Sequence, residues 1–168
     1  MGGEKNPDVG QLVAGLPTAV GTLGDERSRW RLDHVGLVVP EIPHSGSIHG
    51  VQLEGNEMRA SVPRWEVEIV VARQGDQVVE FLCPVSETSA IARFLSSRGE
   101  GFHHVAYSVD GLSSVLAELR GAGLRTTTAQ PVPGVVHSQV IFLNPRDTGG
   151  VLIELCERGS RNCRPSAQ

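Results

Sequence analysis

Between residues 30 and 158, apolar residues alternate with polar ones or gather in short runs bounded by Gly, Pro and Asp. Such runs are typical of strands separated by turns. The pair Gly75-Asp76 stands between two of these runs and predicts a hairpin. We predict strands over Leu32–Val39, Val67–Ala72, Gln77–Cys83, His103–Val109, Gln139–Leu143 and Val151–Cys156.

Two segments have helical periodicity instead. Ser89–Ser97 carries an apolar stripe and is followed by Gly99, which predicts a helix that ends there. Leu112–Ala122 has leucine and valine at helical spacing, with Asp110 as the predicted N-cap and Gly123 as the predicted stop. The chain therefore combines many strands with few helices, which predicts an α+β fold.

The two ends of the chain lack a hydrophobic period. Residues 1–29 are rich in Gly and Pro and predict a flexible tail, with a short helical piece around Gln11–Ala14. Residues 159–168 are polar and predict a second tail. One folded domain over residues 30–158 remains.

Composition limits the partners and the compartment. The 168 residues carry a net charge of −4, so the chain has no basic field for nucleic acid, and no apolar run is long enough for a membrane span. The N-terminus lacks a signal-peptide pattern. Cys83 and Cys156 lie in apolar runs, as small core residues do, so we expect a reducing, cytoplasmic location.

The chain contains an internal repeat. Asp33–Val39 is similar to His103–Val109, and Val79–Leu82 is similar to Ile153–Cys156. A glutamate follows the histidine of each opening strand, after 46 residues in the first half and 50 in the second. The halves therefore are two copies of one module.

The repeated residues suit a metal site. His34 and His104 have small residues two positions on, whereas Glu80 and Glu154 stand within apolar strands. A carboxylate buried there needs a partner, and two imidazoles with two carboxylates suit a divalent ion that keeps open positions. A lone strand histidine is more often a core residue, and a lone strand glutamate more often faces solvent. The repetition gives the metal site the same weight as these alternatives, and the residues alone leave both open.

At these same residues the chain resembles the vicinal oxygen chelate superfamily of glyoxalase-like βαβββ modules, and within it the methylmalonyl-CoA epimerases. The likeness is carried by Leu32–Gly36, Ser89–Leu95, Arg98–Ala106 and Phe142–Leu155. It implies two tandem modules, about 31–84 and 103–157, joined by a linker helix at 87–98. They would form a pseudo-twofold open barrel around a metal site.

The resemblance also implies a ligand set and a cofactor. The metal ligands would be His34, Glu80, His104 and Glu154, with His104 preferred because it occupies the same place in its strand as His34. His103 would then point to the opposite face, in an outer or surface role. The ion would be Co, Mn, Ni or Zn, since these donors accept all four.

The implied reaction is epimerisation at the carbon between a thioester and a carboxylate. A divalent ion would stabilise the enolate charge, and a base on each face would exchange the proton. Glu154 would be one base. Glu68 is the candidate for the other, with Glu66 on the same strand face as the fallback, and a solvent-facing Glu68 is the alternative.

The sequence departs from the family around the substrate. Residues 40–50 contain two Pro and two Gly, so we expect the first-module helix to be abridged. The other departures are Arg64-Trp65, Pro133–Ser138 and Asn144. They leave the metal ligands intact and indicate a changed substrate.

We therefore expect a metal-dependent epimerase of an acyl thioester, either methylmalonyl-CoA or a related carrier-bound, polyketide-like compound of secondary metabolism. The alternatives are another tailoring enzyme of the superfamily (lyase, cyclase or glyoxalase-type) and a small-molecule binding or resistance protein. Neither nucleic acid nor membrane is an expected partner, and exposed sheet edges allow a homodimer.

Overall fold

The structure, a computed structural model, describes residues 30–157. The predicted tails and the helical piece around Gln11–Ala14 lie outside this range. The described chain forms a curled seven-stranded mixed sheet. In spatial order its strands are β4 (Met58–Val62), β5 (Val67–Gln74), β6 (Gln77–Pro84), β1 (Arg31–Val38), β7 (Gly101–Val109), β9 (Leu152–Glu157) and β8 (Val140–Leu143).

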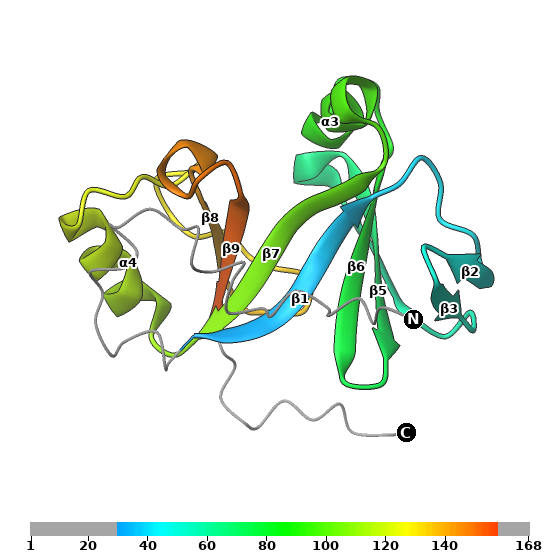
Figure 1. Cartoon of the computed structure of the whole chain (residues 1–168), viewed down its shortest axis with the longest axis horizontal. Coiled ribbons are helices and arrows are strands. Elements are labelled where there is room, and N and C mark those ends of the chain that lie inside the picture. Colours follow the sequence, from blue (N-terminus) through cyan, green and yellow to red (C-terminus); the bar gives the residue numbers. More distant parts are fainter. Residues whose placement is uncertain (1–29, 158–168) are drawn as a thin grey trace, which may run out of the picture.

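The sheet consists of two halves built alike. β1 runs parallel to β6 with Gly36 opposite Glu80, and β7 runs parallel to β9 with Ala106 opposite Glu154. In each half, the residue two positions after the strand histidine lies opposite the glutamate: Gly36 follows His34, and Ala106 follows His104. β1 and β7 are antiparallel neighbours and join the halves at the centre of the molecule (Figure 1). The predicted α+β fold of two tandem modules is confirmed.

The segment between β1 and β4 differs in the two halves. In the second half, β7 is followed by α4 (Leu112–Gly121). In the first half, the described chain has no helix there, and the short strands β2 (Gly46–Ile48) and β3 (Val51–Leu53) form a hairpin. His49 at its turn has a positive φ of 49°. The prolines and glycines of residues 40–50 thus replace the first-module helix, as predicted.

The predicted helices are present, but one cap is different. α3 (Ala90–Arg98) begins at Ser89, whose hydroxyl accepts a hydrogen bond from the Ala92 amide at 3.0 Å. The prediction of Asp110 as the N-cap of α4 was wrong, because Gly111 occupies that position without a side-chain bond. Instead, the Glu157 carboxylate on β9 accepts the amides of Gly111 at 3.3 Å and Leu112 at 2.7 Å. None of the helices described is long and apolar enough to cross a membrane.

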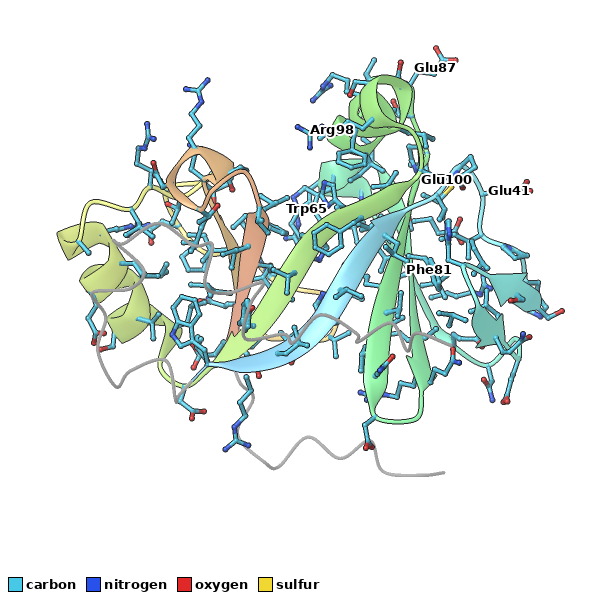
Figure 2. All side chains as sticks on the ribbon, in the orientation of Figure 1. Glu41, Trp65, Phe81, Glu87, Arg98 and Glu100 are labelled. Carbon is cyan, nitrogen blue, oxygen red and sulfur yellow. The ribbon has the colours of Figure 1, made fainter. Side chains whose placement is uncertain are left out.

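Each half has its own apolar core. In the second half, α4 packs on β8 and β9 through Leu112, Leu116 and Leu119. In the first half, Ile91 of α3 packs over β1, β5 and β6. Trp65, in the 3₁₀ turn Pro63–Trp65, contacts core residues of both halves and stands near the centre of the molecule (Figure 2). It therefore lies where the two modules face each other.

Candidate metal centre and substrate cavity

Four side chains from four strands converge between the halves: His34, Glu80, His104 and Glu154. One ligand atom of each lies within 4.8 Å of those of the others. The His104 Nε2 is 3.1 Å from Glu154 Oε2, 3.5 Å from Glu80 Oε2 and 3.3 Å from His34 Nε2. The His34 Nε2 is 3.7 Å from Glu80 and 3.8 Å from Glu154. The structure thus brings together all four residues named as ligands.

Strand register explains this convergence. Across the β1–β7 pair, His34 lies opposite Ala106 and Gly36 lies opposite His104, so both rings project from the same face on a diagonal. The parallel partners β6 and β9 then place Glu80 and Glu154 on either side. Space is also required: a Cβ at position 36 would lie 2.2 Å from Cε1 of His104. The missing side chain of Gly36 is what admits the His104 ring.

The cluster is buried and contains two carboxylates. The four side chains belong to residues that are 1% to 8% exposed. Burial disfavours a charged His34, but its hydrogen bonds to Asp33 and Glu80 and the charges of Glu80 and Glu154 raise its pKa to about 10. Burial opposes ionisation of Glu154 too, but the two histidines lower its pKa. Two buried carboxylates require positive charge nearby. The four donors fit one divalent ion when His34 is in its neutral, singly protonated form.

Further polar groups surround the two imidazoles. Asp33 Oδ1 lies 3.0 Å from His34 Nδ1 and 2.9 Å from His137 Nε2. His103 Nδ1 lies 3.0 Å from His104 Nδ1. Burial and the neighbouring His104 lower the pKa of His103 to about 4, so its ring is neutral. His103 thus contacts a candidate ligand directly, the outer role considered for it, and does not point to the opposite face.

A cavity of about 440 Å³ adjoins the cluster. Its floor includes Glu80, His104 and Glu154, and its walls are mostly apolar, with Trp65 and Phe142 in edge-to-face contact at 6.3 Å. Residues from both halves therefore enclose it. Its polar wall residues are Arg64, Glu66, Thr88, Ser89, Arg93, His103 and Thr127. A mostly apolar cavity with a few convergent charged groups is typical of a small-molecule binding site.

Glu66 and Glu68 occupy different faces of the sheet. Glu66 lines the cavity, and its Oε2 accepts the Thr88 hydroxyl at 3.4 Å. Its backbone is left-handed, with φ 52° and ψ 47°, which is strained for a residue with a Cβ and clusters at functional sites. This turn ends the 3₁₀ segment and rotates Glu66 out of the alternation of β5.

Glu68 pairs with Cys83, which is three residues from Glu80 along β6. Because side chains alternate between the faces of a strand, Glu68 lies on the sheet face away from the cluster. The pKa of the Cys83 thiol is raised by burial and by the negative charges of Glu68 and Glu41. The structure does not bring Glu68 to the cavity. The sequence predicted that Glu66 and Glu68 share one face of the strand. In the structure, the left-handed backbone of Glu66 directs the two side chains to different faces.

Two residues beside the cluster were not predicted from the sequence as site residues. Asp33 and His137 were not named, although Asp33 directly precedes a candidate ligand, which is where an orienting carboxylate can be sought. Asn144, one of the departures from the family, accepts the Arg146 amide at the start of the turn Pro145–Asp147. Its side chain caps this turn.

Comparison with known proteins agrees with this geometry. The family model "Glyoxalase/Bleomycin resistance protein/Dioxygenase superfamily" matches residues 33–142. The chain belongs to this superfamily. The human mitochondrial methylmalonyl-CoA epimerase is 32% identical over 128 residues, which cover 74% of this chain and 72% of that protein. The ethylmalonyl-CoA/methylmalonyl-CoA epimerase of Cereibacter sphaeroides is 32% identical over 129 residues, 74% of this chain and 96% of that protein.

Solved structures give the same result. A Streptomyces coelicolor methylmalonyl-CoA epimerase in complex with 2-nitronate-propionyl-CoA has a TM-score of 0.66 and 25% identity, covering 77% of this chain and 98% of that one. The predicted kinship with these epimerases is confirmed. The superfamily member described here is accordingly an enzyme of the isomerase class.

Proposed function

We propose that this enzyme is a metal-dependent epimerase that inverts the α-carbon of an acyl thioester carrying a second carbonyl group, such as methylmalonyl-CoA or a related carrier-bound, polyketide-like compound. The observation that carries the proposal is the buried His₂Glu₂ cluster at the floor of a mostly apolar cavity. The curated relatives named above act on acyl-CoA compounds of this kind. His34, Glu80, His104 and Glu154 would hold one Co, Mn, Ni or Zn ion.

A bound divalent ion supplies Lewis-acid stabilisation of the negative charge that develops on the thioester oxygen. The protein supplies the proton transfers. Inversion requires one group to remove the α-proton and another to return a proton on the opposite face. Glu154, on β9 of the second half, and Glu66, at the start of β5 of the first half, both line the cavity. We assign these two carboxylates to the two faces, with Glu66 in the role first considered for Glu68.

Charge at the cavity supports an anionic substrate. The guanidinium groups of Arg64 and Arg93 line its wall, and each donates a hydrogen bond to a backbone oxygen, of Pro133 and Thr88 respectively. Arg64 and Arg93 thus place two cationic side chains among the residues that line the cavity. They would bind the carboxylate or phosphate groups of the substrate, as arginine commonly does. Trp65, Phe142 and the neighbouring aliphatic side chains would exclude water from the reacting carbon.

The test uses the purified chain, methylmalonyl-CoA and deuterated solvent, with Co²⁺ or Mn²⁺ added. We expect metal-dependent exchange of the α-proton, followed by NMR. Glu66→Gln should reduce inversion about 10²–10⁴-fold, while exchange persists for the epimer whose α-proton faces Glu154. Glu68→Gln is the matched control on the opposite sheet face and should behave as the wild type.

Two outcomes would count against the proposal. Absence of exchange in the metal-loaded wild type, with a carrier-bound thioester also inactive, would exclude the substrate class. Loss of inversion in Glu68→Gln but not in Glu66→Gln would exclude the role of Glu66.

A further inference from the structure

The side of the His34 ring that faces away from the cluster is held by two residues to which the proposed reaction assigns no role. Asp33 Oδ1 lies 3.0 Å from His34 Nδ1 and 2.9 Å from Nε2 of His137. The rings of His34 and His137 are stacked, with centroids 6.4 Å apart and planes 8° from parallel. One carboxylate oxygen thus receives two N–H groups from two stacked imidazoles.

This arrangement determines which nitrogen of His34 is free. A carboxylate at hydrogen-bond distance requires Nδ1 to carry a proton, which leaves Nε2 as the nitrogen that can give its lone pair to a metal ion held together with Glu80, Glu154 and His104. Metal-binding histidines are commonly oriented by a carboxylate in this manner. We infer that Asp33 and His137 are positioning residues for the metal ligand His34, an inference that rests on the metal site of the proposed function.

His137 adds a connection to the cavity. It lies on the segment between Val132 and Val140, whose backbones pair with hydrogen bonds of 2.8 Å and 2.9 Å. On this segment, Gly134 and Val135 line the cavity of about 440 Å³ beside the cluster. Val136 and His137 line a second cavity of about 230 Å³, together with Asp33 and His34. The Asp33–His137 bond therefore ties a wall of the substrate cavity to a metal ligand. Loading the metal should make this segment more rigid.

The first measurement is the dissociation constant for Zn²⁺, obtained by competition with a chromophoric chelator. Asp33→Asn keeps the shape of the side chain but removes its charge, and we expect affinity to fall about 10–100-fold. His137→Phe keeps a stacked ring but removes the donor, and should weaken binding by less. Because His137 acts through Asp33, the double variant should bind no more weakly than Asp33→Asn alone.

Two controls match these substitutions. Asp147→Asn removes a carboxylate that pairs with Arg125, at Oδ1–Nη2 2.5 Å, outside the residues that line the metal cluster and the two cavities. His44→Phe replaces an exposed histidine in the chain between β1 and β2. Both should leave the Zn²⁺ dissociation constant within about twofold of the wild type, which separates positioning from a general loss of stability.

A second readout needs no variant of Asp33. In the zinc-loaded wild type, ¹⁵N-resolved imidazole spectra should show His34 protonated at Nδ1. Amide hydrogen exchange over residues 134–138 should slow when Zn²⁺ binds, and His137→Phe should abolish that change.

Affinity within twofold of the wild type for folded Asp33→Asn, or a His34 protonated at Nε2, would overturn the inference alone. A wild-type chain that binds no divalent ion would overturn the proposed metal site as well.

Discussion

Substituting Gly36 by alanine should disable the metal centre through one added methyl group. That carbon would lie 2.2 Å from Cε1, 2.3 Å from Nδ1 and 2.7 Å from Nε2 of His104. Ordinary contact begins at about 3.4 Å, so the ring must retreat by roughly 1.2 Å, the difference between 3.4 and 2.2 Å. His104 is 1% exposed and packs against Phe142 and His103, which leaves the ring little room.

The expected loss follows from this displacement. Metal–ligand distances tolerate about 0.2 Å, so a shift several times larger removes His104 from the ligand set. We expect divalent-ion affinity to fall by at least about 10–100-fold, the loss that follows when even an orienting partner of a metal ligand is removed. Overpacking should also destabilise the metal-free chain by about 1–3 kcal/mol.

Two assays separate these effects. Titration with Co²⁺, followed by its visible absorption, measures affinity and ligand geometry. Thermal unfolding with and without Zn²⁺ measures the stabilisation by metal, about 2.7 kcal/mol for the wild type at a hundred times its dissociation constant. Gly36→Ala should lose most of this increment.

Gly121→Ala is the matched control, because a Cβ there meets nothing within 4 Å. Gly36→Ala with the affinity and cobalt spectrum of the wild type would refute the reasoning.

Three more predictions test other parts of the structure. Because the pKa of His34 is raised from 6.5 to about 10 in the metal-free chain, its contribution to stability is fully present below pH 6.5 and lost as pH rises to about 10. Denaturant unfolding of metal-free wild type should show this decline, and His34→Gln should lack it. Glu157→Gln removes the carboxylate that caps α4, and should cost about 0.5–2 kcal/mol in chemical denaturation while leaving Zn²⁺ affinity unchanged. Arg93→Gln should raise KM for the thioester at least tenfold with a smaller change in kcat in steady-state assays, and an unchanged KM would exclude Arg93 as the anion-binding group.

Much of the fold is visible in local patterns. The hairpin at Gly75-Asp76 is present between β5 and β6, since two residues at a tight turn determine the pairing of the flanking strands. α3 begins at Ser89 and ends before Gly99, as its capping residues indicate. The cap of α4 was missed, because Glu157 belongs to a strand 45 residues further along the chain. The strands β2, β3 and β4 were not predicted either, since they are short or lack a sustained apolar run.

The second acid–base residue shows the same limit. Side-chain alternation along a strand predicts that Glu66 and Glu68 share one face of the sheet. Glu66 has a left-handed backbone directly before β5, so its side chain does not follow that alternation. Positive φ at a non-glycine residue is rare, so no propensity rule predicts it. The hydrogen bond from Thr88 and the pairing of the Glu66 carbonyl with Val85 involve groups on another part of the chain.

The amino-acid sequence alone determined the duplicated module and its four repeated His and Glu residues, because side-chain alternation and repetition are properties of the chain itself. Only the tertiary structure decided that β1 and β7 pair antiparallel, that His104 fits over Gly36, and that Asp33 and His137 lie behind His34. Gly36 and His104 are 68 positions apart, and Asp33 and His137 are 104 positions apart. Their register depends on how two curved half-sheets pack, which is a balance of many weak contacts over the whole domain.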